Sequence, residues 1–267
     1  DIAVNNAKTS NNHICIYEES KNIEERYKEN IELATQIKEA ILGNRIICHY
    51  QPLLNIENSE IYSYESLVRL IDNKGNSLAP YKFLDFSKKI KLYSSITKIV
   101  VAQACKTFQN RDENFSINLS VDDIKDLETV DFILKTIKET NTSRRVTFEI
   151  LESEGIENYQ EVISFINQIK SLGARIAIDD FGTGYSNFEH LLRLDVDYIK
   201  IDGSLIKNIV TDDKHRLIVE TIVSFAKRIG IKTVAEFVSD EKILQTIKEI
   251  GISCAQGYHI GKPETLV

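Results

Sequence analysis

Apolar and polar residues alternate along this chain in two distinct rhythms. Short apolar runs bounded by turn residues predict strands, and longer stretches in which apolar residues recur every third or fourth position predict helices. The predicted strands are Ile46–Ile56, Ile61–Ile71, Phe115–Leu119, Val146–Leu151, Arg175–Asp180, Val196–Ile201, Ile231–Glu236 and Ser253–Gly257. The predicted helices are Lys21–Leu42, two stretches between Pro80 and Gln109, Val121–Glu139, Tyr159–Leu172, Ser186–Leu194, Asp213–Ile229 and Asp240–Ile250.

From Phe115 onward, strands and helices follow one another in regular order, which is typical of a parallel α/β sheet. The chain has 267 residues, and its spacing is close to the roughly 30 residues per unit of a (β/α)8 barrel. The first two strands are separated only by a polar turn, residues 57–60, and are expected to form a hairpin. We therefore predict an α/β fold of the TIM-barrel type, preceded by a helix.

Composition narrows the class of protein. The hydrophobic fraction of 42% and the charged fraction of 27% are ordinary for a globular protein. A net charge of −7 argues against a nucleic-acid duplex as partner, yet it leaves room for a small phosphorylated ligand held through divalent cations.

Cysteines and apolar runs indicate a compartment. Cys15, Cys48, Cys105 and Cys254 are scattered without zinc-site spacing, which favours a reducing, cytoplasmic setting. No run of about 18 apolar residues predicts a membrane span, and no signal peptide is recognisable. The chain contains no methionine and begins in mid-pattern, so we expect a fragment of a longer protein that could itself be membrane-tethered.

Polar residues occupy the end of almost every predicted strand. They are His49 and Gln51, Glu65 with Arg69 beyond it, Asn118, Glu149, Asp179, Lys200, Glu236 and Gln256. Burying so many charges is costly unless something compensates them, and a divalent metal bound by carboxylate and amide oxygens would do so. Asp180 could help to hold a second ion, and two ions can clamp a phosphodiester. Lys200 and Arg69 could neutralise its other oxygens.

Each of these residues also has a simpler explanation. A single carboxylate at a strand end is more often a helix cap or a surface charge, and the glycines after Asp180 could mark a plain turn. Lys200 could form a structural salt bridge with Asp179 or Asp202. Arg69 could be solvated at a rim. The functional interpretation rests on the presence of such polar residues at the ends of seven predicted strands. The five histidines share no metal-like spacing and are assigned no catalytic role.

The motifs at these positions resemble those of the EAL-domain cyclic-di-GMP phosphodiesterases. The matching motifs are YQPL at Tyr50, YESLVRL at Tyr64, NLS at Asn118, FEILES at Phe148, DDFGTGYS at Asp179, DYIKID at Asp197, VAE at Val234 and QGYHIGKP at Gln256. The resemblance covers about residues 46–263. It implies a modified TIM barrel with an antiparallel first strand, and Mg²⁺- or Mn²⁺-dependent hydrolysis of cyclic-di-GMP to linear pGpG.

The resemblance also implies a role for each motif residue. Metal ligands would be Glu65, Asn118, Glu149 and Asp179 for a first ion, and Asp179 with Asp180 for a second. Lys200 would lie beside the hydrolytic water, and Glu236 would orient or deprotonate that water or help to hold a metal. Glu152 would anchor the loop from Asp180 to Ser186. Gln51, Leu67, Arg69 and Gln256 would line the dinucleotide site.

Two departures from the family pattern stand out. Ser66 replaces the middle alanine of Glu-Ala-Leu, which exchanges one small residue for another. After Glu236 the family usually has Gly-Val-Glu, whereas this chain has Phe237-Val238-Ser239. The second departure leaves the glutamate in place and changes its neighbours, with consequences for loop packing or dimer contacts.

The remaining expectations concern partners and alternatives. Residues 1–20 resemble the tail of a GGDEF domain, residues 21–44 form a linker helix, and residues 45–267 form the barrel. A homodimer is expected through the segment from Asn187 to Leu194, with Phe188, Leu191 and Leu192 as its apolar positions. Alternative functions are a receptor that binds cyclic-di-GMP without cleaving it, and an inactive scaffold that couples to a GGDEF partner.

Overall fold

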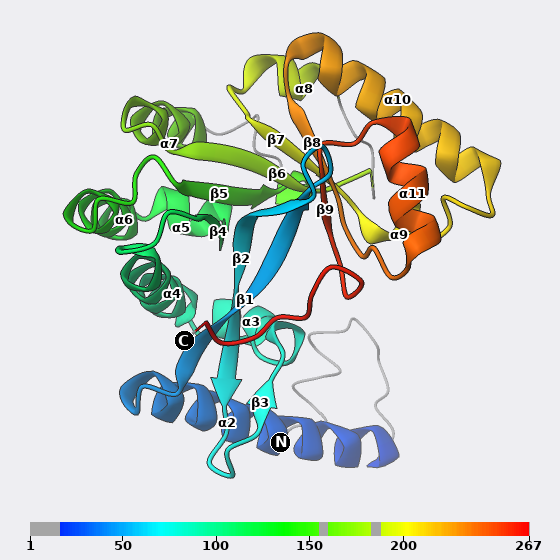
Figure 1. Ribbon diagram of the computed structural model, residues 1–267. Helices are drawn as coiled ribbons and strands as arrows, with labels where there is room; N and C mark the ends of the chain where they lie inside the picture. Colours follow the sequence, from blue (N-terminus) through cyan, green and yellow to red (C-terminus); the bar gives the residue numbers. More distant parts are fainter. Residues whose placement is uncertain (1–16, 155–159, 183–187, 267) are drawn as a thin grey trace. The chain divides into compact units, whose positions relative to one another are not determined.

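The computed structural model describes residues 17–154, 160–182 and 188–266, with side chains from residue 25 onward except at residues 154, 189 and 190 (Figure 1). The chain divides into two compact units, residues 1–46 with 69–93 and residues 47–68 with 94–267.

The larger unit is built on a barrel whose strands follow the predicted ones closely. They are β1 (Ile46–Asn55), β2 (Glu60–Ile71), β4 (Asn114–Leu119), β5 (Val146–Leu151), β6 (Arg175–Phe181), β7 (Tyr198–Ile201), β8 (Lys232–Ala235) and β9 (Cys254–Gln256). The first residue of β1 and the last three residues of β2 are counted with the smaller unit. Neighbours in the sheet run in the order β1-β9-β8-β7-β6-β5-β4-β2, and β1 also pairs with β2, so the ring closes. Adjacent strands from β2 through β4 to β9 are parallel, and β1 is antiparallel to β9. The predicted modified barrel with an antiparallel first strand is confirmed.

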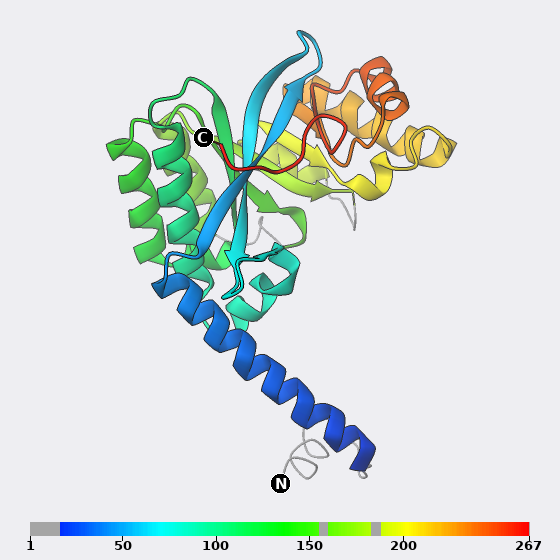
Figure 2. The same cartoon turned by 60° about the horizontal axis from the view of Figure 1, so that its bottom comes forward.

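Helices of this unit lie outside the strands, as Figures 1 and 2 show. They are α4 (Tyr93–Phe108), α5 (Val121–Lys125), α6 (Leu127–Glu139), α7 (Gln160–Ser171), α8 (Phe188–Arg193), α9 (Gly203–Ile206), α10 (Asp213–Ile229) and α11 (Glu241–Ile250), with the 3₁₀ turn η2 (Glu152–Glu154) after β5. The short helix α9 was not predicted; it begins at Gly203, and the Asp202 side chain caps it by accepting a hydrogen bond from the Ser204 N–H.

Local chemistry explains where these helices begin and end. The Asp212 and Asp240 carboxylates accept hydrogen bonds from backbone N–H groups in the first turns of α10 and α11. Gly230, at φ 78°, ends α10 in the left-handed conformation that glycine adopts without penalty. The single helix predicted for Val121–Glu139 is wrong, because Asp126 is extended there and caps α6 through the Glu128 N–H. Its side-chain oxygen competes for the backbone in the way typical of aspartate.

The barrel interior is layered, because side chains two positions apart on a strand share one face. One layer contains the apolar cluster of Leu53, Ala177, Tyr198, Val234 and Cys254. The residue two positions further along each of the last three strands is Lys200, Glu236 or Gln256, and all three are buried. The polar residues predicted at the strand ends therefore form a separate layer at the carboxyl end of the barrel.

The smaller unit contains α2 (Tyr17–Leu42), the short strand β3 (Ser77–Leu78), the 3₁₀ turn η1 (Pro80–Lys82) and α3 (Leu84–Lys89). β3 was not predicted; it pairs with Leu70 and Ile71 at the end of β2. The predicted helix is present and begins earlier, at Tyr17, and its role as a linker stays a prediction. The GGDEF-like tail predicted for residues 1–20 falls almost wholly outside the described residues.

None of the helices in the described part of the chain combines enough residues with enough apolar character to cross a bilayer.

Candidate active site

Lys200 lies at the centre of the polar layer. Its ammonium nitrogen is 2.7 Å from Glu149 Oε2, 2.9 Å from Glu236 Oε1, 3.1 Å from Asp179 Oδ1 and 3.4 Å from Glu65 Oε2. Its side chain is 2% exposed. Strand β7 thus delivers one cation to carboxylates from β2, β5 and β6 and from the residue that follows β8. Of the two partners that the simpler explanation offered for Lys200, Asp179 is present, as one of four carboxylates that share the charge.

Amide side chains complete the surroundings of Glu65. Its Oε1 accepts a hydrogen bond of 2.8 Å from Asn118 Nδ2, and its Oε2 accepts one of 2.6 Å from Gln256 Nε2. Gln256 Nε2 also donates to Gln51 Oε1 at 3.1 Å, and Gln51 Nε2 donates to the carbonyl oxygen of Gly261 at 3.0 Å. The antiparallel β1 therefore brings Gln51 next to the last strand of the barrel.

Burial and shared charge shift these groups in different directions. Burial alone would lower the pKa of Lys200, but Asp179, Glu149, Glu236 and Glu65 together raise it well above its ordinary value. Burial raises the pKa of Glu149 well above its usual range despite Lys200, and Glu65 and Asp179 add to that rise.

Glu65 touches the same ammonium but has a lowered pKa. Burial works against ionisation there too, and it is outweighed by Lys200 and the two amide hydrogen bonds from Gln256 and Asn118. Two donated amide hydrogen bonds stabilise a carboxylate that burial would otherwise neutralise. Glu65 is thus the group held in its charged form, and Glu149 the one on which a proton is favoured.

Glu236 and Asp180 both hold protons more tightly than free carboxyl groups. Burial raises the pKa of Glu236 to about 8, with contributions from Asp179 and Glu65 that oppose the effect of Lys200. Burial and then the neighbouring charges of Asp179 and Asp202 raise the pKa of Asp180. The raised pKa values indicate that the protein's own cations do not balance the negative charge of these carboxylates.

The donor set fits a divalent metal ion. Glu65, Glu149 and Asp179 offer oxygens within 4.8 Å of one another, and so do Asp179, Asp180 and Glu236. Gln256 Oε1 is buried without a hydrogen-bond partner. An all-oxygen set of carboxylates and amides is the preference of Mg²⁺, Ca²⁺ and Mn²⁺.

The end of β6 is shaped around its two aspartates. Pairing with β7 shifts register between Ile178 and Phe181, and Asp180 is left-handed at φ 55°. Its N–H donates to Asp179 Oδ1 at 3.0 Å. Such a bulge redirects consecutive side chains, so both carboxylates can serve one site although a regular strand would send them to opposite faces.

The predicted loop anchor is supported at one end. Glu152 Oε2 accepts a hydrogen bond of 3.2 Å from the N–H of Gly182, just after the β6 bulge. The rest of the predicted loop, residues 183–187, lies outside the described part of the chain. The role of Glu152 in holding that loop therefore stays a prediction.

Two predicted substrate contacts also stay predictions. Leu67 is half-buried on β2. Arg69 belongs to the smaller unit, so its place relative to the carboxylates is not described. The structure brings the other predicted site residues together in the polar layer. Their individual roles stay predictions.

Beneath the polar layer there is little free space. A cavity of about 20 Å³ lies inside the barrel, and its lining includes the small side chains of Ser63, Ser116, Thr147 and Ala177 and the stem of Lys200. That is room for about one water molecule.

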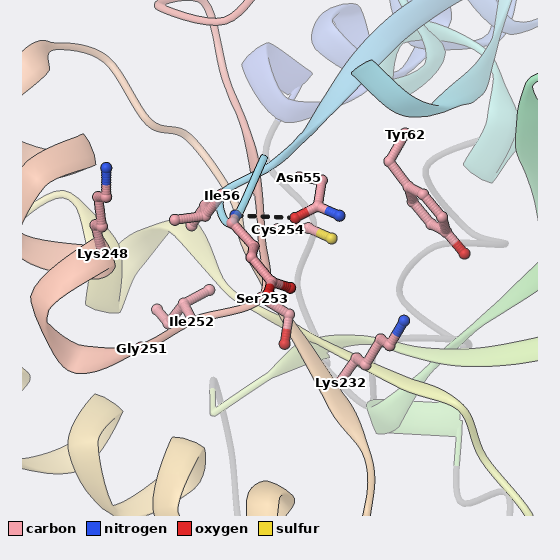
Figure 3. Close-up of a pocket in the computed structure, with 10 residues that line it drawn as sticks. Asn55, Ile56, Tyr62, Lys232, Lys248, Gly251, Ile252, Ser253 and Cys254 are labelled. Carbon is pink, nitrogen blue, oxygen red and sulfur yellow. Dashed lines mark hydrogen bonds between the residues drawn. The ribbon is translucent and has the colours of Figure 1, made fainter. Parts of the chain in front are cut away.

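A larger hollow of about 410 Å³ lies elsewhere, near the β1–β2 turn and the starts of β8 and β9 (Figure 3). It is lined by Tyr62, Lys232, Lys248 and Ser253, among others, and by none of the predicted site residues. Lys248 stands in the last turn of α11, where a cation stabilises the helix dipole. The position of Lys248 is thus explained by its stabilisation of α11.

Metal-free protein should lose stability as the pH rises from 6 to 9. The pKa of Glu236 is raised in the folded state from 4.5 to about 8, so its contribution is complete below pH 4.5 and is lost progressively until the pH passes 8. Glu149 and Asp180 act in the same direction, whereas Glu65 and Lys200 contribute constantly across this window. Thermal melts in EDTA measure the effect.

The Glu236→Gln variant is the matched control, because glutamine cannot titrate and should make the fall in stability shallower. A wild-type free energy of unfolding that stays level or rises between pH 6 and 9 would contradict the prediction.

Comparison with known proteins agrees with this geometry. The family model described as EAL domain matches residues 34–263. The cyclic di-GMP phosphodiesterase PdeB of Shewanella oneidensis is 35% identical over the whole chain, which spans 32% of that protein. The probable cyclic di-GMP phosphodiesterase PdeA of Escherichia coli is 32% identical over 88% of the chain, again across 32% of its own length.

Solved structures show the same fold. The PaMucR phosphodiesterase in complex with c-di-GMP superposes with a TM-score of 0.82 at 27% identity, covering 87% of this chain and 97% of that one. The EAL enzyme Bd1971, bound to cAMP and cyclic-di-GMP, gives 0.83 at 26% identity, covering 92% and 69%. The chain spans about a third of the length of the curated relatives it matches. On its match to the family model and its barrel, this chain belongs to the EAL domain family.

Proposed function

We propose that this chain hydrolyses cyclic-di-GMP to linear pGpG in a reaction that requires Mg²⁺ or Mn²⁺. The observation that carries the proposal is the buried group of four carboxylates around Lys200 at the carboxyl end of the barrel. In barrels of this type, that end is where catalytic residues lie. The relatives named cyclic di-GMP phosphodiesterases support the choice of substrate.

Each residue of the site has its own proposed role in the reaction. Glu65, Asn118, Glu149 and Asp179 would hold one ion, and Asp179 with Asp180 a second. The bound ions supply charge neutralisation and a water of lowered pKa. Glu236 would accept the proton of the attacking water in its ionised form, which bound cations favour by lowering its raised pKa. The Lys200 ammonium, permanently charged here, stabilises negative charge that develops on the phosphate oxygens.

The reaction adds one water across one phosphodiester bond. A hydroxyl group becomes attached to phosphorus, the bond to one ribose oxygen breaks, and that oxygen receives a proton. One cleavage of the ring gives a linear dinucleotide. Because Glu236 sits 2.9 Å from Lys200, proton acceptance and charge stabilisation occur in one compact site.

The direct test is to incubate EDTA-stripped protein with cyclic-di-GMP and to measure pGpG by chromatography. We expect turnover after Mg²⁺ or Mn²⁺ is added, and little with Ca²⁺, whose larger and looser coordination shell misplaces the water. Full turnover in EDTA would rule out the metal requirement. Binding without turnover in any metal would favour the receptor alternative, and absence of both would favour the scaffold.

Glu236 and Arg69 should affect different kinetic constants. Glu236→Ala removes an interaction used in the transition state, so kcat should fall by roughly 10²- to 10⁴-fold while binding persists. Arg69→Ala should mainly raise KM, since a phosphate contact acts in ground and transition states alike.

Steady-state kinetics and melting temperatures of both variants decide between these roles. Glu139→Gln and Arg228→Ala change exposed residues of α6 and α10 and should behave as wild type. A Glu236→Ala protein that melts early but keeps a near-normal kcat would make Glu236 a structural partner of Lys200.

We further propose that the chain works as a homodimer through α8 and α10. The structure corrects part of the predicted surface, because Leu191 is buried and Phe188 packs on Phe225 of α10 with ring centroids 4.6 Å apart. Leu192 remains 62% exposed, and α10 adds exposed Leu217.

Light scattering of a Leu192→Glu, Leu217→Glu double variant tests this surface. We expect a dimer for the wild type and a monomer for the variant, since charges oppose burial of an apolar interface. Leu127→Glu, at an equally exposed leucine of α6, is the matched control and should remain dimeric. A strictly monomeric wild type at high concentration would count against the proposal.

A cytoplasmic location and a GGDEF-like domain in cis complete the proposed setting. The named relatives are about three times as long as this chain, and one is called a bifunctional diguanylate cyclase and cyclic di-GMP phosphodiesterase. Sequencing of the parent gene and fractionation of the parent protein test both points.

A further inference from the structure

Phe237, the residue directly after Glu236, carries two unfavourable features at once. Its backbone is left-handed, with φ 54°, and its side chain is 55% exposed. The other described non-glycine residues with positive φ are Asn44, Ser59, Lys91, Asn141 and Asp180, none of them apolar. A bulky apolar residue in this conformation is a true outlier, and such outliers gather at functional sites.

The phenyl ring is nevertheless held in one place. A Cβ atom added to Gly203 would come within 2.2 Å of Phe237 Cδ2, so the ring lies directly against the backbone at the start of α9. The Lys207 ammonium, also on the α9 side, is 4.2 Å from the ring centroid. A cation at this distance from an aromatic face is attracted to it. Gly203 and the Lys207 ammonium therefore cover part of the ring, and more than half of the residue remains exposed.

Backbone hydrogen bonds place this ring at the rim of the candidate active site. The N–H of Glu236 donates to the carbonyl of Ile201 at 3.3 Å, and the N–H of Val238 donates to the carbonyl of Gln256 at 3.0 Å. The two neighbours of Phe237 in the chain are therefore bonded to the ends of β7 and β9, the strands that carry Lys200 and Gln256. Its Cα is about 3.8 Å from that of Glu236.

We propose that Phe237 is a stacking platform for one guanine base of the dinucleotide. The inference rests on the proposed function: if a phosphodiester lies among the carboxylates, its bases must extend outward to the rim. A fixed, open aromatic ring is the side chain that a purine face recognises. Stacking of a base on an aromatic side chain accounts for roughly 5- to 150-fold in affinity.

The absence of tryptophan from the chain permits a direct optical test. Phe237→Trp introduces a single tryptophan at the platform, and combining it with Glu236→Gln prevents turnover. We expect the fluorescence to be quenched by cyclic-di-GMP in parallel with the binding isotherm from calorimetry, because the guanine would stack on the indole. The control is Tyr81→Trp with Glu236→Gln, at a 77% exposed position of η1, which should bind equally and stay bright.

Kinetics of Phe237→Gly provide an independent measurement in the otherwise wild-type chain. Glycine relieves the left-handed strain, so the melting temperature should hold or rise. Loss of the platform should raise KM roughly 5- to 150-fold with little change in kcat, the sign of lost uniform binding. Phe237→Tyr, which keeps an aromatic face, should restore a KM near wild type.

The outcomes separate this inference from the proposed function. If the wild-type protein neither binds nor cleaves cyclic-di-GMP, both fail. If it does, but the tryptophan is silent during calorimetric binding or Phe237→Gly keeps the wild-type KM, the platform alone is overturned. The latter result would assign the exposed ring to a protein partner instead.

Discussion

The site depends on one buried ammonium group. Four carboxylates in a low-dielectric interior could not remain close together without a positive charge, and Lys200 reaches all of them within 3.4 Å. That single cation does not neutralise them. Glu149 and Glu236 consequently hold protons tightly, and the protein alone leaves the group with too little positive charge. This shortage of positive charge makes the same residues a fitting cage for a divalent ion.

The barrel makes this arrangement possible by closing. Glu65 and Gln256 come from strands that are far apart in the sequence, and they touch at 2.6 Å because β1 joins β2 to β9. The antiparallel direction of β1 also supplies Gln51, which contacts Gln256 and the backbone near the end of the chain. The amide groups link the first and last strands while they fix the orientation of Glu65.

Much of the fold and the grouping of site residues could be predicted from the sequence, for identifiable reasons. Strand ends such as Glu149 and Asp179 stand out because isolated charges interrupt apolar runs, and parallel strands must bring such ends together. The break at Asp126 could not be seen, since apolar spacing continues on both sides of it. The sharing of Lys200 among four carboxylates could not be predicted either, because it depends on side-chain distances across the barrel. The left-handed backbone of Phe237 was equally hidden, because the residue type argues against it; only the departure from Gly-Val-Glu marked the position.

The small side chains beneath the polar layer have a consequence for how the site exchanges ions. Ser63, Ser116, Thr147 and Ala177 leave space for about one water molecule and no more. The Lys200 ammonium therefore cannot withdraw into the interior when a cation arrives. Room for an arriving ion would have to come from the mouth side of the polar layer, not from behind the lysine.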